Sequence, residues 1–200
     1  FVPFRKEISV MVARNEKGEV ATFPVVENIH EDHILAMTIA PARIPAALAA
    51  KARKTALQAV KSLNGTGIFG VEMFVKGTDV LINEIAPRPH NSGHYTIEAC
   101  SHSQFELHLR AITGLPLVEP RLLSPAVLVN LLGTRDFEGD YRIQGFEEAA
   151  KIPGASIHIY GKKGSRVKRK LGHVTVLDRT VAGALAKAEK IKKMVRIVPA

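Results

Sequence analysis

The sequence predicts an α+β fold built mainly on antiparallel sheet. Predicted strands outnumber predicted helices, and short turns join several consecutive strands in the manner of hairpins. The clearest hairpin covers residues 68–86, and a long amphipathic helix precedes it. This order of elements favours antiparallel sheet with flanking helices over regularly alternating strands and helices.

The first half of the chain is predicted to hold most of the strands and the longest helix. Pro45 stands at the first position of that helix, where proline is favoured, and Asn64-Gly65 ends it. We expect strands at 6–14, 20–26 and 35–40, the helix from Pro45 to Leu63, the hairpin at 68–86, and helices at about 95–100 and 103–113.

The composition changes near residues 118–124, where we place a soft boundary between 1–118 and 119–200. The second segment is predicted to be small and rich in strands. Its expected elements are strands at 126–132, 156–160 and 171–177, a short helix at 146–150, and an amphipathic helix from Thr180 to about Met194.

Composition limits the classes of protein. Hydrophobic residues make up 46% and charged residues 24%, as in ordinary globular proteins, and no apolar run approaches the ~20 residues of a membrane span, so no membrane partner is expected. The single cysteine, Cys100, excludes an internal disulfide framework and indicates a reducing compartment, predicted to be the cytoplasm. Cys100 is either a nucleophile or a small buried hydrophobe. The chain begins at Phe1 without Met, so we expect a fragment of a longer protein.

The net charge of +9 is compatible with two kinds of partner. A basic protein can bind nucleic acid, or it can bind nucleotides and phosphorylated metabolites. Aromatic residues are only 6% of the chain and Trp is absent, which disfavours a base-stacking surface. Charge alone does not separate the two.

Two glutamates in the predicted hairpin carry the strongest chemical signal. If the turn consists of residues 77–79, Lys76 pairs with Val80, and counting back places Glu72 opposite Glu84. Opposed side chains have Cβ atoms ~5 Å apart, where like charges destabilise the sheet.

A divalent cation would relieve that repulsion. Mg²⁺ typically takes one or two carboxylates together with phosphate oxygens, and Asn83 could add an amide oxygen. The alternative is that Glu72 and Glu84 are two hydrated side chains on an exposed face of the sheet.

The loop that follows Glu84 is short, rigid and polar. Its two prolines stiffen it, and Gly93 permits close approach of a ligand. Arg88 suits bidentate contact with phosphate or bicarbonate. His90 and His94 could bind zinc, although no further Cys or His residues cluster nearby. A purely structural polar loop is the remaining alternative.

A second loop, within residues 160–173, is strongly basic. Three interpretations fit it: a hydrated, flexible run of charge, a nucleic-acid patch, or a site where lysine and arginine converge on a monophosphate. The residues alone do not choose among them.

Several of these segments together resemble one family. Residues 72–74, 83–94, 103–106 and 108–112 look like the corresponding motifs of carboxyaminoimidazole ribonucleotide synthetases, the PurK-type, ATP-dependent component of phosphoribosylaminoimidazole carboxylase. The similarity extends from Phe1 to about residue 180. The two-glutamate hairpin by itself would indicate only the ATP-grasp superfamily.

The resemblance implies a fold and a reaction. Residues 1–118 would be the C-terminal part of an ATP-grasp domain, and residues 119–200 a small β-rich C-terminal domain with a rudiment of a single-hybrid-like motif. The enzyme would use ATP and bicarbonate to carboxylate aminoimidazole ribonucleotide in de novo purine biosynthesis, by way of carboxyphosphate, with release of ADP and phosphate. The resemblance also implies a homodimer, and a mutase, fused to the parent chain or separate, that receives the product.

The resemblance also implies roles for individual residues. Glu72 and Glu84 match the metal ligands, for Mg²⁺ or alternatively Mn²⁺, and Arg88 is the candidate catalytic residue. Val2, Glu7, His30, Asn83 and Glu84 match nucleotide-binding positions. The candidate substrate-binding residues are His90, Asn91, Ser92, Lys162, Arg169 and Lys170, which favours the monophosphate interpretation of the basic loop.

Two alternatives remain beside this assignment. One is another ATP-grasp carboxylase or ligase, and the other is a basic nucleotide- or nucleic-acid-binding module without catalysis. The lysines and glycine-rich lid that ATP-grasp enzymes carry before the hinge are absent from these 200 residues. We therefore expect this chain alone to be inactive.

Overall fold

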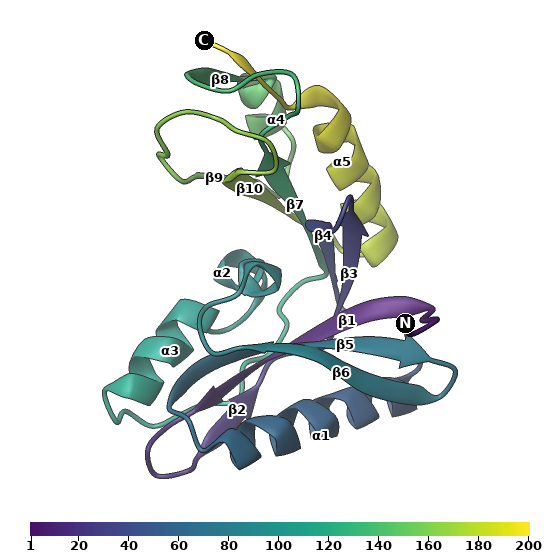
Figure 1. Cartoon of the computed structure of the whole chain (residues 1–200), viewed down its shortest axis with the longest axis vertical. Helices are drawn as coiled ribbons and strands as arrows, with labels where there is room; N and C mark the ends of the chain where they lie inside the picture. The colour runs from purple at the N-terminus through teal and green to yellow at the C-terminus, as the bar shows by residue number, and fades with distance from the viewer.

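A nine-stranded antiparallel sheet runs through the computed structural model, which describes residues 1–200 (Figure 1). Its strand order is β6-β5-β1-β3-β4-β7-β10-β9, and β2 also pairs with β1. The strands are β1 (Lys6–Arg14), β2 (Val20–Thr22), β3 (Val26–Glu31), β4 (Ile34–Ala40), β5 (Gly67–Lys76), β6 (Asp79–Ala86), β7 (Ala126–Leu132), β9 (Ala155–Ile159) and β10 (Lys170–Leu177). The predicted α+β class is confirmed.

Helices cover both faces of this sheet. They are α1 (Ala46–Leu63), the 3-10 turn η1 (Asn91–Gly93), α2 (Thr96–Ala99), α3 (Gln104–Ile112), α4 (Phe146–Ala150) and α5 (Val181–Met194). In Figure 1, α1 lies on one side of the strands of the first half, and α2 and α3 lie on the other. None of the helices is long and apolar enough to cross a membrane.

Strand β1 is buried on both faces, and the alternation of its side chains explains why. Ile8, Val10 and Val12 pack toward α1, whereas Met11 and Ala13 pack toward Tyr95 and Leu107 beneath α2 and α3. Successive residues of a strand point to opposite faces, so an almost continuous apolar run can fill two cores.

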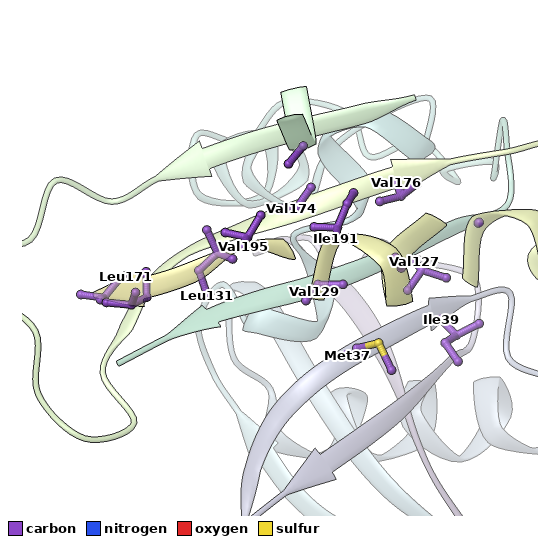
Figure 2. Packing of buried hydrophobic residues seen from close by; sticks show 14 residues of the cluster. Met37, Ile39, Val127, Val129, Leu131, Leu171, Val174, Val176, Ile191 and Val195 are labelled. Atoms are coloured by element: carbon purple, nitrogen blue, oxygen red, sulfur yellow. The ribbon is translucent and has the colours of Figure 1, made fainter. Parts of the chain in front are cut away.

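A third core lies beneath α5 (Figure 2). Val127 and Val129 of β7, with Val174 and Val176 of β10, meet Ile191 of the helix. Strands β4 and β7 pair directly, from Met37 opposite Val129 to Ala40 opposite Ala126. The sheet is therefore continuous across the composition change near residues 118–124.

Two local departures from the predicted elements have clear causes. The expected strand at 20–26 is divided, because Pro24 has no N–H to donate, so β2 ends at Thr22 and β3 begins at Val26. The two-stranded sheet of β8 (Tyr141–Gln144) and β11 (Arg196–Pro199) was not predicted, because each strand has only four residues and the partner is distant in sequence.

Cys100 packs in the core below α2. Burial raises the pKa of its thiol to about 12, so the sulfur is protonated at neutral pH. The interpretation as a buried small hydrophobe is confirmed over that as a nucleophile.

Candidate functional site

The β5–β6 hairpin sets Glu72 directly opposite Glu84, as predicted, although the predicted turn is wrong. The turn has two residues, Gly77 and Thr78, and Lys76 pairs with Asp79 rather than with Val80. Gly77 takes a left-handed conformation with φ of 60°, which favours this tighter turn. A two-residue turn alone would place Glu72 opposite residue 83.

A β-bulge next to Glu72 restores the opposition of the two glutamates. The register shifts between Met73, which pairs with Ile82, and Glu72, which pairs with Glu84, so Asn83 is the extra residue. In a regular strand Asn83 and Glu84 would point to opposite faces, whereas here both line the same cleft. The bulge thus directs two neighbouring polar side chains into one site.

The cleft beside this hairpin is open and polar, with a volume of about 750 Å³. It unites five of the predicted site residues, which come from β1, β3, β5 and β6: Glu7, His30, Glu72, Asn83 and Glu84. Its other lining residues are Phe4, Arg5, Lys6, Glu27, Asn28, Ile29, Asp32 and His33. The cleft therefore joins positions that are widely separated in sequence.

The charged form of the Glu72 carboxylate is destabilised by its surroundings. Burial raises its pKa, and the nearby carboxylates of Glu84 and Glu7 raise it further, while His30 and Lys170 act in the opposite direction. A cation bound between Glu72 and Glu84 would relieve this repulsion. The donor set fits Mg²⁺, which needs few protein carboxylates, and no three His, Cys, Asp or Glu side chains anywhere in the chain form a metal cage of their own.

Glu7 and His30 interact across the next pair of strands. His30 Nδ1 contacts Glu7 Oε2, and the two side chains project from β1 and β3 at the cleft wall. Beside Glu7, Phe4 stacks on Phe74 with ring centroids 4.4 Å apart. This wall offers a carboxylate, an imidazole and an aromatic face to a ligand.

The polar loop after β6 is held by one buried glutamine. Gln104 lies at the start of α3. Its Oε1 accepts a hydrogen bond from the His90 N–H at 2.9 Å, and its Nε2 donates to the His90 carbonyl oxygen at 2.8 Å. The same side-chain nitrogen lies 2.8 Å from His94 Nδ1. A Cβ on Gly93 would come within 2.6 Å of Gln104 Oε1, so only glycine permits this contact.

Asn91 and Ser92 are buried beneath the loop. Ser92 Oγ is 2.9 Å from both Ser9 Oγ and His90 Nδ1. Asn91 Nδ2 donates to Asn130 Oδ1 at 2.8 Å. Both side chains thus fix the loop to the sheet, and their contact with a substrate stays a prediction.

His90, Arg88 and Lys170 lie around the Glu72 side of the cleft. His90 Nε2 is 3.5 Å from Glu72 Oε1. Burial lowers the pKa of His90 to about 4, and the positive charges of Lys170 and Arg88 add to that effect. Burial also lowers the pKa of Lys170, with Arg88 acting in the same direction and Glu72 opposing. Arg88 itself is exposed, and its guanidinium donates to the Pro89 carbonyl at 3.1 Å.

The remaining predicted residues, Val2, Lys162 and Arg169, do not line the cleft. Lys162 is exposed in the basic loop, and Arg169 donates to the carbonyl oxygens of Lys163 and Gly164, at 2.7 and 3.1 Å. Val2 is half-buried and is not among the cleft-lining residues. The basic loop is therefore shaped in part by its own arginine.

Several residues of the site carried only a weak signal in the sequence. Asn28 lines the cleft and donates to Ser9 Oγ at 3.0 Å, and Thr38 donates to Asn28 Oδ1 at 3.2 Å. Ser9, Asn28 and Thr38 are polar residues inside apolar strands, and a buried polar side chain needs a partner. That mismatch was the available clue.

The chain is similar to known families and proteins. Residues 1–105 match the ATP-grasp domain, and residues 126–187 match the phosphoribosylaminoimidazole carboxylase C-terminal domain. Phosphoribosylaminoimidazole carboxylase of Schizosaccharomyces pombe is 50% identical over 185 residues, which are 89% of this chain and 33% of that protein. N5-carboxyaminoimidazole ribonucleotide synthase of Bacillus subtilis is 44% identical over 181 residues, 90% of this chain and 46% of that protein.

Solved structures agree with these matches. N5-carboxyaminoimidazole ribonucleotide synthetase from Thermotoga maritima has a TM-score of 0.93 at 55% identity, covering 100% of this chain and 54% of that one. The synthase from Aspergillus clavatus, in complex with ADP and 5-aminoimidazole ribonucleotide, has a TM-score of 0.87 at 38% identity, covering 96% and 52%. The chain thus spans about half the length of these synthetases and a third of the fungal carboxylase.

Proposed function

Because the chain belongs to the ATP-grasp family and, within it, to the N5-carboxyaminoimidazole ribonucleotide synthetases, we propose that it supplies part of the active site that carboxylates aminoimidazole ribonucleotide. ATP and bicarbonate are the other substrates, and ADP and phosphate are released. The observation that carries the proposal is the meeting of Glu7, His30, Glu72, Asn83 and Glu84 in one cleft. The structures of relatives with ADP and with ATP support a nucleotide there.

We assign the two ends of the cleft to the two ends of the nucleotide. Glu7 and His30 can contact the ribose, and Val2 lies in the segment leading to them. Asn83, Glu72 and Glu84 would face the phosphates. Glu72 and Glu84 would hold Mg²⁺, or alternatively Mn²⁺, which when bound neutralises phosphate charge during phosphoryl transfer.

Arg88 and His90 would act where the phosphoryl group meets bicarbonate. The exposed guanidinium of Arg88 can orient bicarbonate and stabilise the charge of carboxyphosphate. His90 is partly buried and its lowered pKa keeps it neutral at pH 7, so it can accept a proton from the attacking amine. Lys170 adds a second positive charge within reach of the same region.

The basic loop would bind the 5′-phosphate of the ribonucleotide. Lys162 is free in solvent, and Arg169 is held near it by two backbone carbonyls of the same loop. Asn91 and Ser92 would contact the sugar or base only if their present hydrogen bonds are shared with the ligand. The complex of the Aspergillus clavatus synthase with 5-aminoimidazole ribonucleotide supports a ribonucleotide site in this fold.

The wider assignments are proposals of the same kind. We divide the chain at 1–118 and 119–200, and we propose a cytoplasmic homodimer that binds no nucleic acid. The product would pass to a mutase, and the smaller share of the fungal carboxylase that this chain covers, 33% against 46% in Bacillus subtilis, fits a further fused domain there. Since the chain spans about half of a synthetase, we expect residues 1–200 alone to release ADP far more slowly than a complete synthetase.

The test is substrate-dependent ADP release by the full-length protein. We expect release to require both bicarbonate and aminoimidazole ribonucleotide. Release triggered by another amine or by biotin, and not by this ribonucleotide, would indicate a different ATP-grasp carboxylase or ligase. Salt-sensitive RNA binding without any ATP dependence would instead indicate the nucleic-acid-binding module.

A further inference from the structure

Three histidine rings form a column where the two segments of the chain meet. His94 follows η1, His173 lies on β10 and His158 lies on β9. The centroids of His94 and His173 are 5.0 Å apart with planes inclined by 24°, and those of His173 and His158 are 4.4 Å apart with an angle of 13°. Phe105 of α3 stacks on the outer face of His94 at 5.6 Å.

Each imidazole of the column is fixed by a hydrogen bond from a different element. Gln104 Nε2 lies 2.8 Å from His94 Nδ1, the Tyr160 hydroxyl lies 2.8 Å from His173 Nδ1, and Glu98 Oε1 lies 2.5 Å from His158 Nε2. A ring that is both stacked and hydrogen-bonded has little freedom to tilt or slide. The column is therefore a rigid connection.

The middle ring is the most enclosed. His173 is only 2% exposed, and its Nε2 has no hydrogen-bond partner. Burial lowers its pKa to about 3, and that of His94 to about 4. Both rings are therefore neutral at physiological pH, and charge repulsion does not weaken the stack.

The column joins the two loops to which substrate binding is assigned. His94 ends the polar loop 87–94, whose backbone is held at His90 by Gln104. Tyr160 and His173 flank the basic loop 161–169, and Tyr160 N–H also donates to the Leu171 carbonyl at 2.9 Å. A shift of either loop would have to move this stack.

We propose that His173 is a positioning residue that holds the polar loop 87–94 and the basic loop 161–169 in register, through its stacking on His94 and its hydrogen bond to Tyr160. The ribonucleotide would bridge the loops, with its phosphate on the basic loop and its amine near His90. The inference rests on the proposed function. The distance between the two loops that bind the ribonucleotide would then depend on His173, a residue that contacts neither the ribonucleotide nor ATP.

The test is steady-state kinetics of the full-length protein with His173→Phe and Tyr160→Phe. Phenylalanine at 173 keeps a stacked ring but removes the hydrogen-bonding nitrogen, and Tyr160→Phe removes the same bond from the other side. We expect each variant to raise KM for the ribonucleotide about 3- to 10-fold, as the loss of one neutral hydrogen bond predicts. KM for ATP and kcat should stay within about twofold of wild type, since the nucleotide cleft lies on β1, β3, β5 and β6.

Two further comparisons separate positioning from stability. KM for the ribonucleotide in the double variant should not exceed that of the more affected single variant, because both substitutions remove the same Tyr160–His173 hydrogen bond. Val174→Ala is the matched control: it lies next to His173 on β10 but packs in the α5 core. It should lower the melting temperature without changing KM for the ribonucleotide.

Unchanged KM for the ribonucleotide in both single variants would overturn the proposal, as would equal rises in both Michaelis constants or additive effects in the double variant. If His173→Phe fails to fold, Tyr160→Phe alone decides the same question. A wild-type protein that released no ADP with the ribonucleotide would overturn the proposed function. Calorimetric binding of the ribonucleotide to the same variants would then still test the positioning role. A Kd weakened about three- to tenfold would support it, and an unchanged Kd would overturn it.

Discussion

Replacing Glu84 by glutamine should stabilise the metal-free protein. Glu72 and Glu84 lie directly opposite each other on β5 and β6, and the burial of Glu72, together with Glu84, raises the pKa of Glu72. Like charges in such a pair cost about 0.2–1 kcal/mol. Glutamine keeps nearly the same shape without the charge, so the melting temperature should rise by up to about 2–4 °C for a chain of this size.

The same substitution should remove most of the activity. If Glu84 holds the cation that neutralises the phosphates, its loss removes a charged contact worth about 1.5–3 kcal/mol. Each 1.36 kcal/mol changes a rate about tenfold, so magnesium-dependent ADP release by the full-length protein should fall at least about 10- to 150-fold. Stability and activity are thus expected to change in opposite directions.

The assay pairs thermal unfolding without metal with ADP release over a range of Mg²⁺ concentrations. Glu138→Gln is the matched control, because Glu138 is exposed and forms no ion pair. It should change neither property. Near-normal turnover of Glu84→Gln at saturating Mg²⁺ would refute the assigned role, and an unchanged or lower melting temperature would refute the repulsion between the two glutamates.

Three further predictions concern the histidines, the basic loop and the glutamine clamp. His94 and His173 have pKa values lowered to about 4 and about 3, so as the pH falls below ~6.5 these two residues bind protons in the unfolded chain but not in the folded one. Urea unfolding should therefore show the free energy of unfolding falling by up to about 1.4 kcal/mol per pH unit for each residue, down to about pH 4. A flat profile would contradict this. Arg169→Ala should raise KM for the ribonucleotide about 10- to 100-fold in steady-state kinetics and leave KM for ATP unchanged, because it removes a charged contact to the 5′-phosphate. A raised KM for ATP alone would show that the loop was assigned wrongly. Gln104→Ala should lower the free energy of unfolding by about 2–4 kcal/mol in urea titrations, because it leaves the His90 N–H without a partner and leaves the His90 carbonyl with only the Gly93 N–H. A change below about 0.5 kcal/mol would argue against the clamp.

The hairpin shows what sequence reasoning could reach and where it fell short. The apolar alternation of Phe69, Val71 and Met73 correctly placed Glu72 on the other face. The turn length was wrong by one residue, and the unpredicted bulge at Asn83 offset that error. Turn type and bulges depend on backbone conformations that several sequences can adopt, so the correct pairing of the glutamates did not follow from a correct register.

Contacts between distant segments were the main part that could not be predicted. Local patterns located most strands and helices, but nothing in the pattern pairs β4 with β7 or β8 with β11. Gln104 lies in the motif 103–106 that carries the family resemblance, but nothing in the sequence indicated that its side chain holds a loop 14 residues earlier. Such partners are chosen by tertiary packing, which single-sequence periodicity does not encode.

The alternation that builds the core also builds the site. Along β1, even-numbered residues such as Ile8 and Val10 face α1, so Glu7 and Ser9 must face the opposite side. The register sets Ser9 opposite Glu72, Glu72 opposite Glu84, and Asn28 opposite both Glu7 and Thr38. A row of polar side chains therefore crosses five neighbouring strands, and the polar loop after β6 is anchored on that row through the Ser9–Ser92 hydrogen bond. A one-residue slip of β1 would bury Glu7 in the α1 core and expose Ile8 in the cleft, so the packing of the core enforces the geometry of the site.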